Sequence, residues 1–344
     1  MYKYILVAVT TVFTLLSCDI KNKNSDRSSI SGEDTLNVNM ESISDDNSIY
    51  LLVGTYTAGE SKGIYVYQFD TVSGYSEFKS VANIDNPSYL TISKDERFVY
   101  AISEQGGNKG SASAFSFNKE NGTLKLLNTQ MTGGDDPCYI SIDNEGRNVL
   151  TANYSGGSIT HFPVNENGSL EKPSQVITFT GKGVDPERQK KPHLHCIVYS
   201  PNQNYVFAND LGTDKIYKFE VNKDTTGNYL KVGTPPSFKL ADGSGPRHIT
   251  FSPDNKFAYL ITELSGMAMA FSYDDQTGNL SEIQLIFADT LNAKGSADIH
   301  VSPDGKFLYA SNRLQGDGIA IFSINQQDGK LTKVGYQETG IHPR

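Results

Sequence analysis

The chain has 344 residues, of which 37% are hydrophobic and 20% are charged, so it holds enough apolar material for a core and is not a disordered polymer. Its formal net charge of −9 lacks the long-range attraction that nucleic-acid binders use, and we expect no nucleic-acid partner. Length alone suggests about two domains, although repeat folds often occupy such a length as one unit. The 31 Gly and 13 Pro favour many short strands over long helices.

Residues 1–17 are predicted to be a bacterial signal peptide. Lys3 is their only charge, and the apolar run from Tyr4 to Leu16 is too short for a membrane-spanning helix. The sequence Leu-Leu-Ser-Cys ending at Cys18 resembles the lipobox, in which the Cys is lipidated and becomes the first residue after cleavage. We therefore expect an exported lipoprotein, anchored in the cell envelope and touching the membrane only through its lipid. The alternative, a buried Cys in an ordinary first strand, lacks neighbouring residues that would pack around it.

Residues 18–48 are rich in Asn, Ser, Asp and Lys, which predicts a polar tether before a single folded domain at 49–344. Two thiols, Cys138 and Cys196, fall in that domain. Because they form neither a disulfide framework nor a zinc-type spacing, we expect both to lie on strands as small apolar residues.

One phrase recurs along this domain, most clearly at 91–101, 251–260 and 301–310, each time as an apolar strand, a Ser-Pro-Asp-Gly-like turn and a second strand. The copies are anchored by residues separated by 50, 57, 52 and 50 positions: Ser93, Asp143, Ser200, Ser252 and Ser302. A third and a fourth strand follow in each unit. Four antiparallel strands per repeat with alternating apolar residues predict the blade of an all-β propeller.

The first copy begins at Tyr50 with what aligns as the second strand of a blade, so its innermost strand is missing. We expect the C-terminal end to supply that strand, since a propeller that mixes its termini leaves no open edge. The sequence ends at 341–344, where a further blade is expected to start, so about 50 more residues are expected beyond it. The alternative is a shorter ring that closes in another way.

Stacking the repeats predicts two rings of side chains at one mouth of the central channel. The loop that enters the inner strand and the loop that leaves the second strand lie on the same face of a blade. Five positions before the anchors, and at the next matching place, come Ser88, Cys138, His195, Arg247, Ala297 and Arg344. Eleven positions after them, with the matching residue of the first copy, come Tyr56, Glu104, Tyr154, Leu211, Glu263 and Arg313.

These rings bring one His, three Arg, two Glu and two Tyr together, a costly set unless the charges are paired or bind a ligand. Guanidinium groups suit an anionic or carbonyl-bearing substrate, and a Glu with a His supplies acid–base capacity. The alternative is a network of ion pairs that ties blades together around a water-filled channel. His193 and His195 face the same side of a strand, but no third ligand accompanies them, so we expect no metal and no cofactor. His248 is expected on the opposite face of its strand from Arg247, in the core or in a supporting bond.

The segments 192–201, 209–216, 245–254, 262–264 and 297–313, together with the opening 52–57 and 63–67, resemble the lactonase family of seven-bladed propellers. That family includes bacterial propeller-type 6-phosphogluconolactonases and is related to carboxy-cis,cis-muconate cyclases. The resemblance implies seven blades, the last of them incomplete here, with the residues at 342–344 entering the seventh. By motif it also implies a catalytic set of His195, Arg247, Glu263 and Arg313.

We therefore predict a lactone hydrolase in which Arg247 and Arg313 hold the substrate anion and the developing oxyanion while Glu263 or His195 activates water. The expected partner is a small anionic lactone, contacted by Tyr56, Glu104, Tyr154, His193 and Arg344. Two alternatives stay open: a lactonising cycloisomerase of the carboxymuconate type, and a non-catalytic surface propeller that binds a ligand. Export would separate the enzyme from the cytoplasmic pool of phosphorylated sugars that such relatives use, which leaves the lactone itself open.

Overall fold

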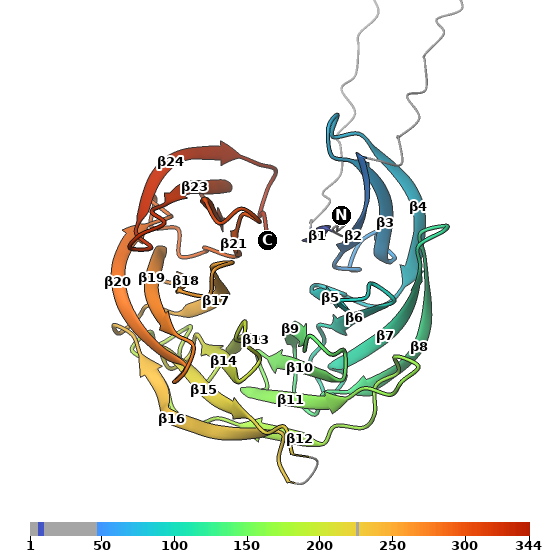
Figure 1. Cartoon of the computed structure of the whole chain (residues 1–344), viewed down its shortest axis with the longest axis horizontal. Helices are drawn as coiled ribbons and strands as arrows, with labels where there is room; N and C mark the ends of the chain where they lie inside the picture. Colours follow the sequence, from blue (N-terminus) through green and yellow to red (C-terminus); the bar gives the residue numbers. More distant parts are fainter. Residues whose placement is uncertain (1–5, 10–46, 225–226) are drawn as a thin grey trace, which may run out of the picture.

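The computed structural model describes residues 6–9, 47–224 and 227–344, and these form six four-stranded sheets set around a common centre (Figure 1). Each sheet is one blade, and the blades follow one another along the chain. The first two blades are built from β1 (Leu6–Val9), β2 (Ser48–Gly54), β3 (Gly63–Asp70) and β4 (Ser76–Asn83), and from β5 (Leu90–Ile92), β6 (Phe98–Ser103), β7 (Ser111–Asn118) and β8 (Thr123–Met131). The third and fourth are built from β9 (Pro137–Ile142), β10 (Asn148–Asn153), β11 (Ser158–Pro163) and β12 (Gln175–Thr178), and from β13 (Leu194–Tyr199), β14 (Tyr205–Asp210), β15 (Lys215–Val221) and β16 (Leu230–Lys239). The last two are built from β17 (Pro246–Phe251), β18 (Phe257–Thr262), β19 (Met267–Asp274) and β20 (Asn279–Phe287), and from β21 (Ile299–Val301), β22 (Phe307–Asn312), β23 (Gly318–Ile324) and β24 (Leu331–Glu338).

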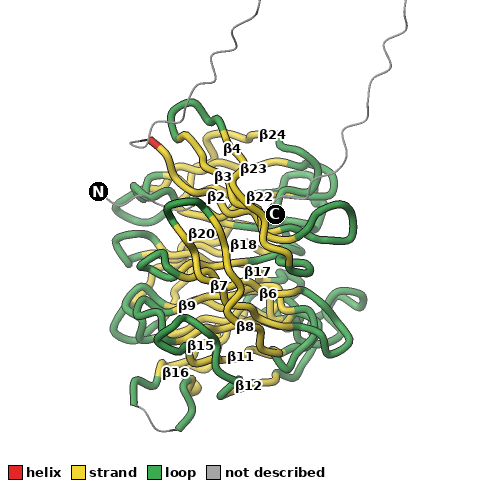
Figure 2. The backbone as a smooth tube through the Cα atoms, turned by 90° about the vertical axis from the view of Figure 1, so that its right-hand side faces the viewer, coloured by secondary structure: helices red, strands yellow, loops and turns green. Residues whose placement is uncertain are grey.

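Blades two to six share one topology, with the strands in chain order from the centre outward and antiparallel to their neighbours. This is the arrangement that the repeat predicts. In the side view, loops gather on two opposite sides of the strands (Figure 2). Among the described residues, no helix is long and apolar enough to cross a membrane.

The first blade is completed at its inner edge by an N-terminal segment. We expected its innermost strand from the C-terminal end, whereas β1, residues 6–9, pairs with β2 there, and the pairing is parallel. An unpaired strand edge presents a row of amide and carbonyl groups that any extended apolar segment within reach can pair with. The place assigned to an inner strand is thus filled by β1 in this structure, and the supply of that strand from a segment beyond residue 344 stays a prediction. Residues 10–46, which hold Cys18 and most of the expected tether, lie outside the described part, and β2 begins at Ser48.

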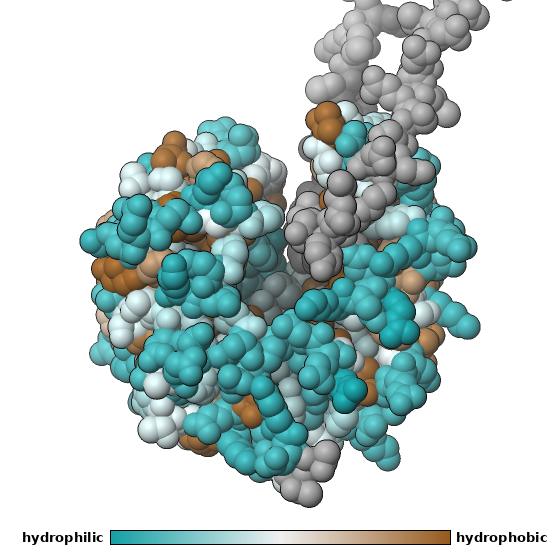
Figure 3. Space-filling model, viewed as in Figure 1, coloured by the Kyte–Doolittle hydropathy of each residue, from teal (hydrophilic) through white to brown (hydrophobic). Residues whose placement is uncertain are grey.

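The core lies between blades and not within a single centre. Each of the five apolar clusters joins two neighbouring blades: in one, Phe257 and Ile261 of β18 pack with Leu308 and Phe322 of the sixth blade. Alternation along each strand puts one face of a blade against each neighbour. The buried apolar clusters therefore lie between blades, and the face in Figure 3 is mostly hydrophilic with small separate hydrophobic groups.

Tyrosine hydroxyls connect successive blades as well. Tyr100 in β6 donates to the carbonyl of Gly168 in the third blade at 3.0 Å, and Tyr259 in β18 donates to the carbonyl of Gly329 in the sixth at 3.1 Å. Tyr205 in β14 makes the same kind of bond to Gln276. These bonds help to hold these pairs of blades in their relative orientation.

Candidate functional site

Backbone irregularities aim three side chains at the channel. Cys138, His195 and Arg247 each lie on an inner strand at a point where the pairing register shifts, so that none of them has a partner residue on the second strand. A β-bulge of this kind re-aims a side chain and is common beside active sites. The second predicted ring also takes its expected place, because Tyr56, Glu104, Tyr154, Glu263 and Arg313 each follow the second strand of a blade.

Glu263 is the centre of a buried charge cluster. Its Oε2 accepts a hydrogen bond from Arg247 Nε at 2.9 Å and lies 3.4 Å from Arg313 Nη2. His195 Nε2 lies 3.8 Å from the same oxygen. The structure thus brings together the four residues that the resemblance singled out, from three blades. Glu263 and Arg247 are 5% and 1% exposed, so their charges are shielded from water.

The cluster moves the pKa values of its members in directions that matter for chemistry. Burial raises the pKa of Glu263, but Arg247, Arg313 and Arg188 outweigh it and leave the pKa below its ordinary value. Burial, together with Arg247 and His248, lowers the pKa of His195 well below its ordinary value. Burial and the charge of Arg247 lower the pKa of Arg313 to about 10. At neutral pH the cluster therefore holds an ionised Glu263 and a neutral His195.

Arg188 also belongs to this cluster, although stacking the repeats did not predict it. Its Nη2 donates to Glu263 Oε1 at 2.5 Å and to the hydroxyl of Tyr154 at 3.4 Å. Arg188 lies in the connection between β12 and β13, residues 179–193, which is the longest connection between two of the described blades. One signal in the sequence does mark this connection: the anchor spacing is 57 residues there, and 50 and 52 in the two neighbouring repeats.

The other predicted binding residues form two smaller groups beside the cluster. Tyr154 stacks on His193 with ring centroids 4.3 Å apart and meets His195 edge-on at 5.2 Å. His193 Nδ1 lies 3.1 Å from the carbonyl oxygen of Tyr154, and burial lowers the pKa of His193. This aromatic stack lies against one side of the charge cluster.

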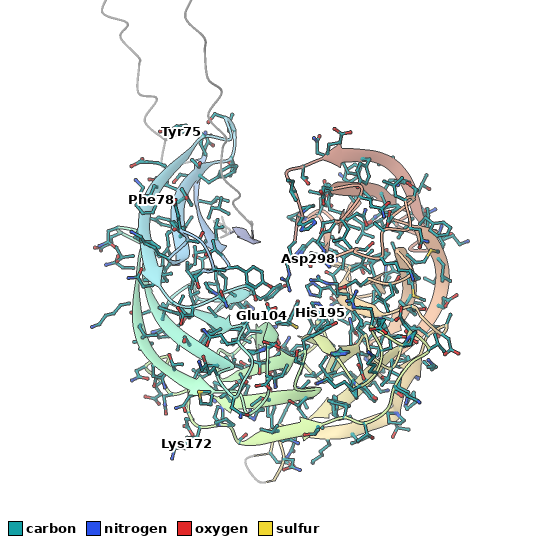
Figure 4. All side chains as sticks on the ribbon, turned by 180° about the vertical axis from the view of Figure 1, so that it is seen from behind. Tyr75, Phe78, Glu104, Lys172, His195 and Asp298 are labelled. Atoms are coloured by element: carbon teal, nitrogen blue, oxygen red, sulfur yellow. The ribbon has the colours of Figure 1, made fainter. Side chains whose placement is uncertain are left out.

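Glu104 is the centre of the second group. Its Oε2 accepts hydrogen bonds from the hydroxyls of Tyr56, at 2.8 Å, and Ser88, and lies 3.6 Å from Arg344 Nη2. Arg344 also donates to the Tyr56 hydroxyl. Burial raises the pKa of Glu104 to about 7, only partly offset by the Ser88 hydrogen bond. Glu104 and His195 lie near the centre of the ring, whereas Lys172 lies on its outside (Figure 4).

Cys138 lies beside His195. Its Sγ lies 3.5 Å from His195 Nδ1, and burial raises the pKa of its thiol well above the ordinary value, so it stays protonated. The predictions that Cys138 and Cys196 are buried strand residues are confirmed. Leu211 and Ala297, the remaining ring positions, are fully buried and apolar.

His248 differs from the prediction. It was expected on the opposite face from Arg247, but its Nε2 lies 3.3 Å from Arg247 Nη1 because the bulge interrupts the strict alternation of the strand. Its Nδ1 bonds Asp298 Oδ1 at 2.6 Å, and Asp298 Oδ2 bonds His300 Nε2 at 2.8 Å. His248 thus supports the Arg247 guanidinium, the second of the two roles expected for it.

No group of three or more His, Cys, Asp or Glu side chains in the described residues is arranged to hold a metal ion. A cavity of about 720 Å³ lies elsewhere, between the turns of the second and third blades, and includes Arg97 and Glu145. None of the charge-cluster residues lines it.

An all-β propeller whose channel mouth gathers guanidinium, carboxylate and imidazole groups belongs to the class of propellers that can bind an anionic or carbonyl-bearing molecule there. The family model described as Lactonase, 7-bladed beta-propeller, matches residues 50–344, and the chain belongs to that family. The family is described with seven blades, and the described residues of this chain form six four-stranded sheets.

Relatives and solved structures agree with this membership. The chain is 43% identical over 298 residues to the 6-phosphogluconolactonase of Bacillus subtilis, which covers 85% of this chain and 82% of the relative. It is similar to a crystal structure from Bacteroides fragilis proposed to be a 6-phosphogluconolactonase, with 54% identity, a TM-score of 0.84, and coverage of 87% and 84% of the two chains. The periplasmic gluconolactonase of Pseudomonas aeruginosa matches with 35% identity, a TM-score of 0.80, and coverage of 85% and 83%.

Proposed function

We propose that the protein hydrolyses a sugar lactone, phosphorylated or not, to the corresponding sugar acid. The observation that carries the proposal is the neutral His195 beside two guanidinium groups, all three within 4 Å of one ionised carboxylate. Names of the Bacillus and Pseudomonas relatives support the same substrate class.

In this proposal, Arg247 and Arg313 bind the lactone carbonyl oxygen and stabilise the oxyanion that forms when water adds to the carbonyl carbon. Guanidinium donors that are held in place before the reaction stabilise an oxyanion most strongly where water is excluded. Glu263 fixes the position of Arg247 through the 2.9 Å hydrogen bond, and its negative charge neutralises part of the positive charge of the site.

His195 accepts the proton of the attacking water. Guanidinium groups hold both carboxylate oxygens of Glu263, whereas His195 Nε2 lies 3.8 Å from Glu263, beyond hydrogen-bond distance, which favours His195 over Glu263 for this role. An oxyanion between Arg247 and Arg313 offsets the charges that depress the pKa of His195, so the imidazole gains basicity as the transition state forms.

Opening of the lactone ring breaks the bond between the carbonyl carbon and the ring oxygen of the lactone, and that oxygen takes up a proton. Glu104, with a pKa raised to about 7, is partly protonated at neutral pH and serves as the donor.

The test compares hydrolysis of 6-phosphoglucono-δ-lactone and glucono-δ-lactone by the wild type, Arg247→Ala and Arg313→Gln. We expect both variants to lose at least about 100-fold in kcat/KM, as loss of an oxyanion donor typically does. Lys172→Gln, an exposed change on the outside of the ring, serves as the control. Full activity of both arginine variants would refute the mechanism, and turnover of a carboxymuconate instead of either lactone would favour the cycloisomerase.

We further propose that residues 1–17 direct export and that Cys18 carries the lipid. The N-terminal sequence pattern supports this, and one relative is a periplasmic enzyme. Cleavage before Cys18 would remove β1 and free the inner edge of β2. Incorporation of labelled palmitate by the wild type, and its loss in Cys18→Ala, tests the proposal; a wild-type protein that keeps residue 1 and takes up no label refutes it.

A further inference from the structure

Arg188 occupies a different position from the other arginines of the charge cluster. The side chains of Arg247 and Arg313 are 1% and 16% exposed, whereas that of Arg188 is 39% exposed. Arg188 also comes from the connection between β12 and β13, and not from the repeating scaffold. Residues on such connections often set specificity while the scaffold holds the reacting groups.

The guanidinium of Arg188 is only partly used. All of the hydrogen bonds that its side chain makes among the described residues start from Nη2, toward Glu263 and Tyr154. Nε and Nη1 therefore remain as donors in the planar fork that matches carboxylate and phosphate.

The cluster carries more positive charge than the proposed reaction needs. Three guanidinium groups, of Arg188, Arg247 and Arg313, surround the single carboxylate of Glu263, which leaves a net charge of +2 while His195 is neutral. Hydrolysis of an uncharged lactone develops one negative charge on the carbonyl oxygen. A second negative charge on the substrate would balance the remaining positive charge.

The backbone around Arg188 is fixed by its neighbour. The buried Gln189 donates from Nε2 to the carbonyl of Leu211 and to Asp214 Oδ1, both at 2.8 Å, and its Oε1 accepts from the amides of Val184 and Asp185. An anchor in which the side-chain amide is fully bonded holds Arg188 at the site before any substrate binds, which lowers the entropic cost of binding.

We infer that Arg188 binds a second anionic group of the lactone, remote from the reacting carbonyl, and thereby selects charged sugar lactones over neutral ones. The inference rests on the proposed lactonase function. Two chemistries supply such a group, a phosphate or a carboxylate at the far end of the sugar. Binding draws on the free donors of Arg188 and leaves its contact with Glu263 in place.

The experiment measures kcat/KM of full-length wild type and Arg188→Gln on three substrates: 6-phosphoglucono-δ-lactone, glucaro-δ-lactone and glucono-δ-lactone. We expect a fall of at least about tenfold on a charged lactone, the usual effect of losing a charge-assisted hydrogen bond, and less than about threefold on the neutral one. The charged substrate that loses more identifies the group as phosphate or carboxylate. Lys190→Gln removes a charge from the same connection, where it pairs with Glu187, and should leave the preference unchanged.

A second measurement keeps this inference separate from the lactonase assignment. Calorimetry of 6-phosphogluconate, glucarate and gluconate binding to the same proteins needs no turnover. If the wild type hydrolyses no lactone, the function is refuted, but selective loss of anion affinity in Arg188→Gln still supports the role of Arg188. An equal fall on all three substrates, or no fall on any, overturns the inference, because Arg188 would then act only through Glu263 or not at all.

Discussion

Glu104 should cost the folded protein stability at neutral and alkaline pH, and its replacement by Gln should recover it. Burial raises the pKa of this carboxyl group from 4.5 to about 7. A group with a raised folded-state pKa binds its proton more tightly in the folded protein. Its favourable contribution is therefore present below pH 4.5 and is lost as the pH rises to 7.

The size of the effect follows from the shift. A change from 4.5 to about 7 corresponds to about 3 kcal/mol of stability lost between the protonated and the ionised protein. In Glu104→Gln the new side chain would still accept the hydrogen bonds of Tyr56 and Ser88, because an amide oxygen has two acceptor sites. Loss of the 3.6 Å pair with Arg344 subtracts about 1 kcal/mol or less. We expect a net gain of about 2 kcal/mol at pH 8 and none at pH 4.5.

Urea unfolding of wild type and Glu104→Gln between pH 4.5 and 8 measures this directly. Glu166→Gln, an exposed carboxamide change in the turn after β11, is the matched control and should show no trend. A Glu104→Gln protein that is no more stable than wild type at pH 8, or whose difference does not change with pH, would show that the environment of Glu104 has been misjudged.

Three further changes test other parts of the structure. Glu263→Gln should lower the free energy of unfolding by about 3 to 5 kcal/mol at pH 7, because it breaks buried ion pairs. The pKa of Glu263 is lowered in the folded protein, so the stability that its carboxylate contributes is present above pH 4.5 and disappears as the pH falls through the folded-state pKa. A loss of stability that is as large at pH 3 as at pH 7 would argue against ion pairing. Tyr259→Phe should cost about 1 kcal/mol in thermal unfolding by removing an interblade bond, and exposed Tyr75→Phe nothing; equal effects would deny the bond any role. Gln189→Ala should speed limited proteolysis between residues 179 and 193, and unchanged cleavage would mean that the anchor is dispensable.

The repeat in the sequence predicted the architecture and most of the mouth. A period near fifty residues with alternating strands defines a blade, and register then decides which positions face the channel, as it did for Glu263 and Arg313. The origin of the first blade's inner strand was beyond this logic, because pairing at an open edge depends on which segment reaches it.

Two features of the candidate site could not be predicted from the sequence, for different physical reasons. Strict alternation placed His248 away from Arg247, and a bulge, which has no reliable signature in the residues themselves, brought them into contact. Arg188 lies outside the repeat, so register says nothing about it. The seven extra residues before Ser200 marked the insertion, yet only the fold shows that it returns to Glu263.

The three positions at which the strand register shifts affect how a propeller of this kind can acquire a different substrate specificity. At Cys138, His195 and Arg247 the side chain belongs to a residue without a partner in the ladder, so the pairing on either side does not depend on its identity. Substitution there exchanges a thiol, an imidazole or a guanidinium at the channel while the apolar contacts between blades stay as they are. The ring thus separates the strand pairing within each blade from the chemical groups at the channel, so that a residue facing the substrate can change in one blade without a change of register.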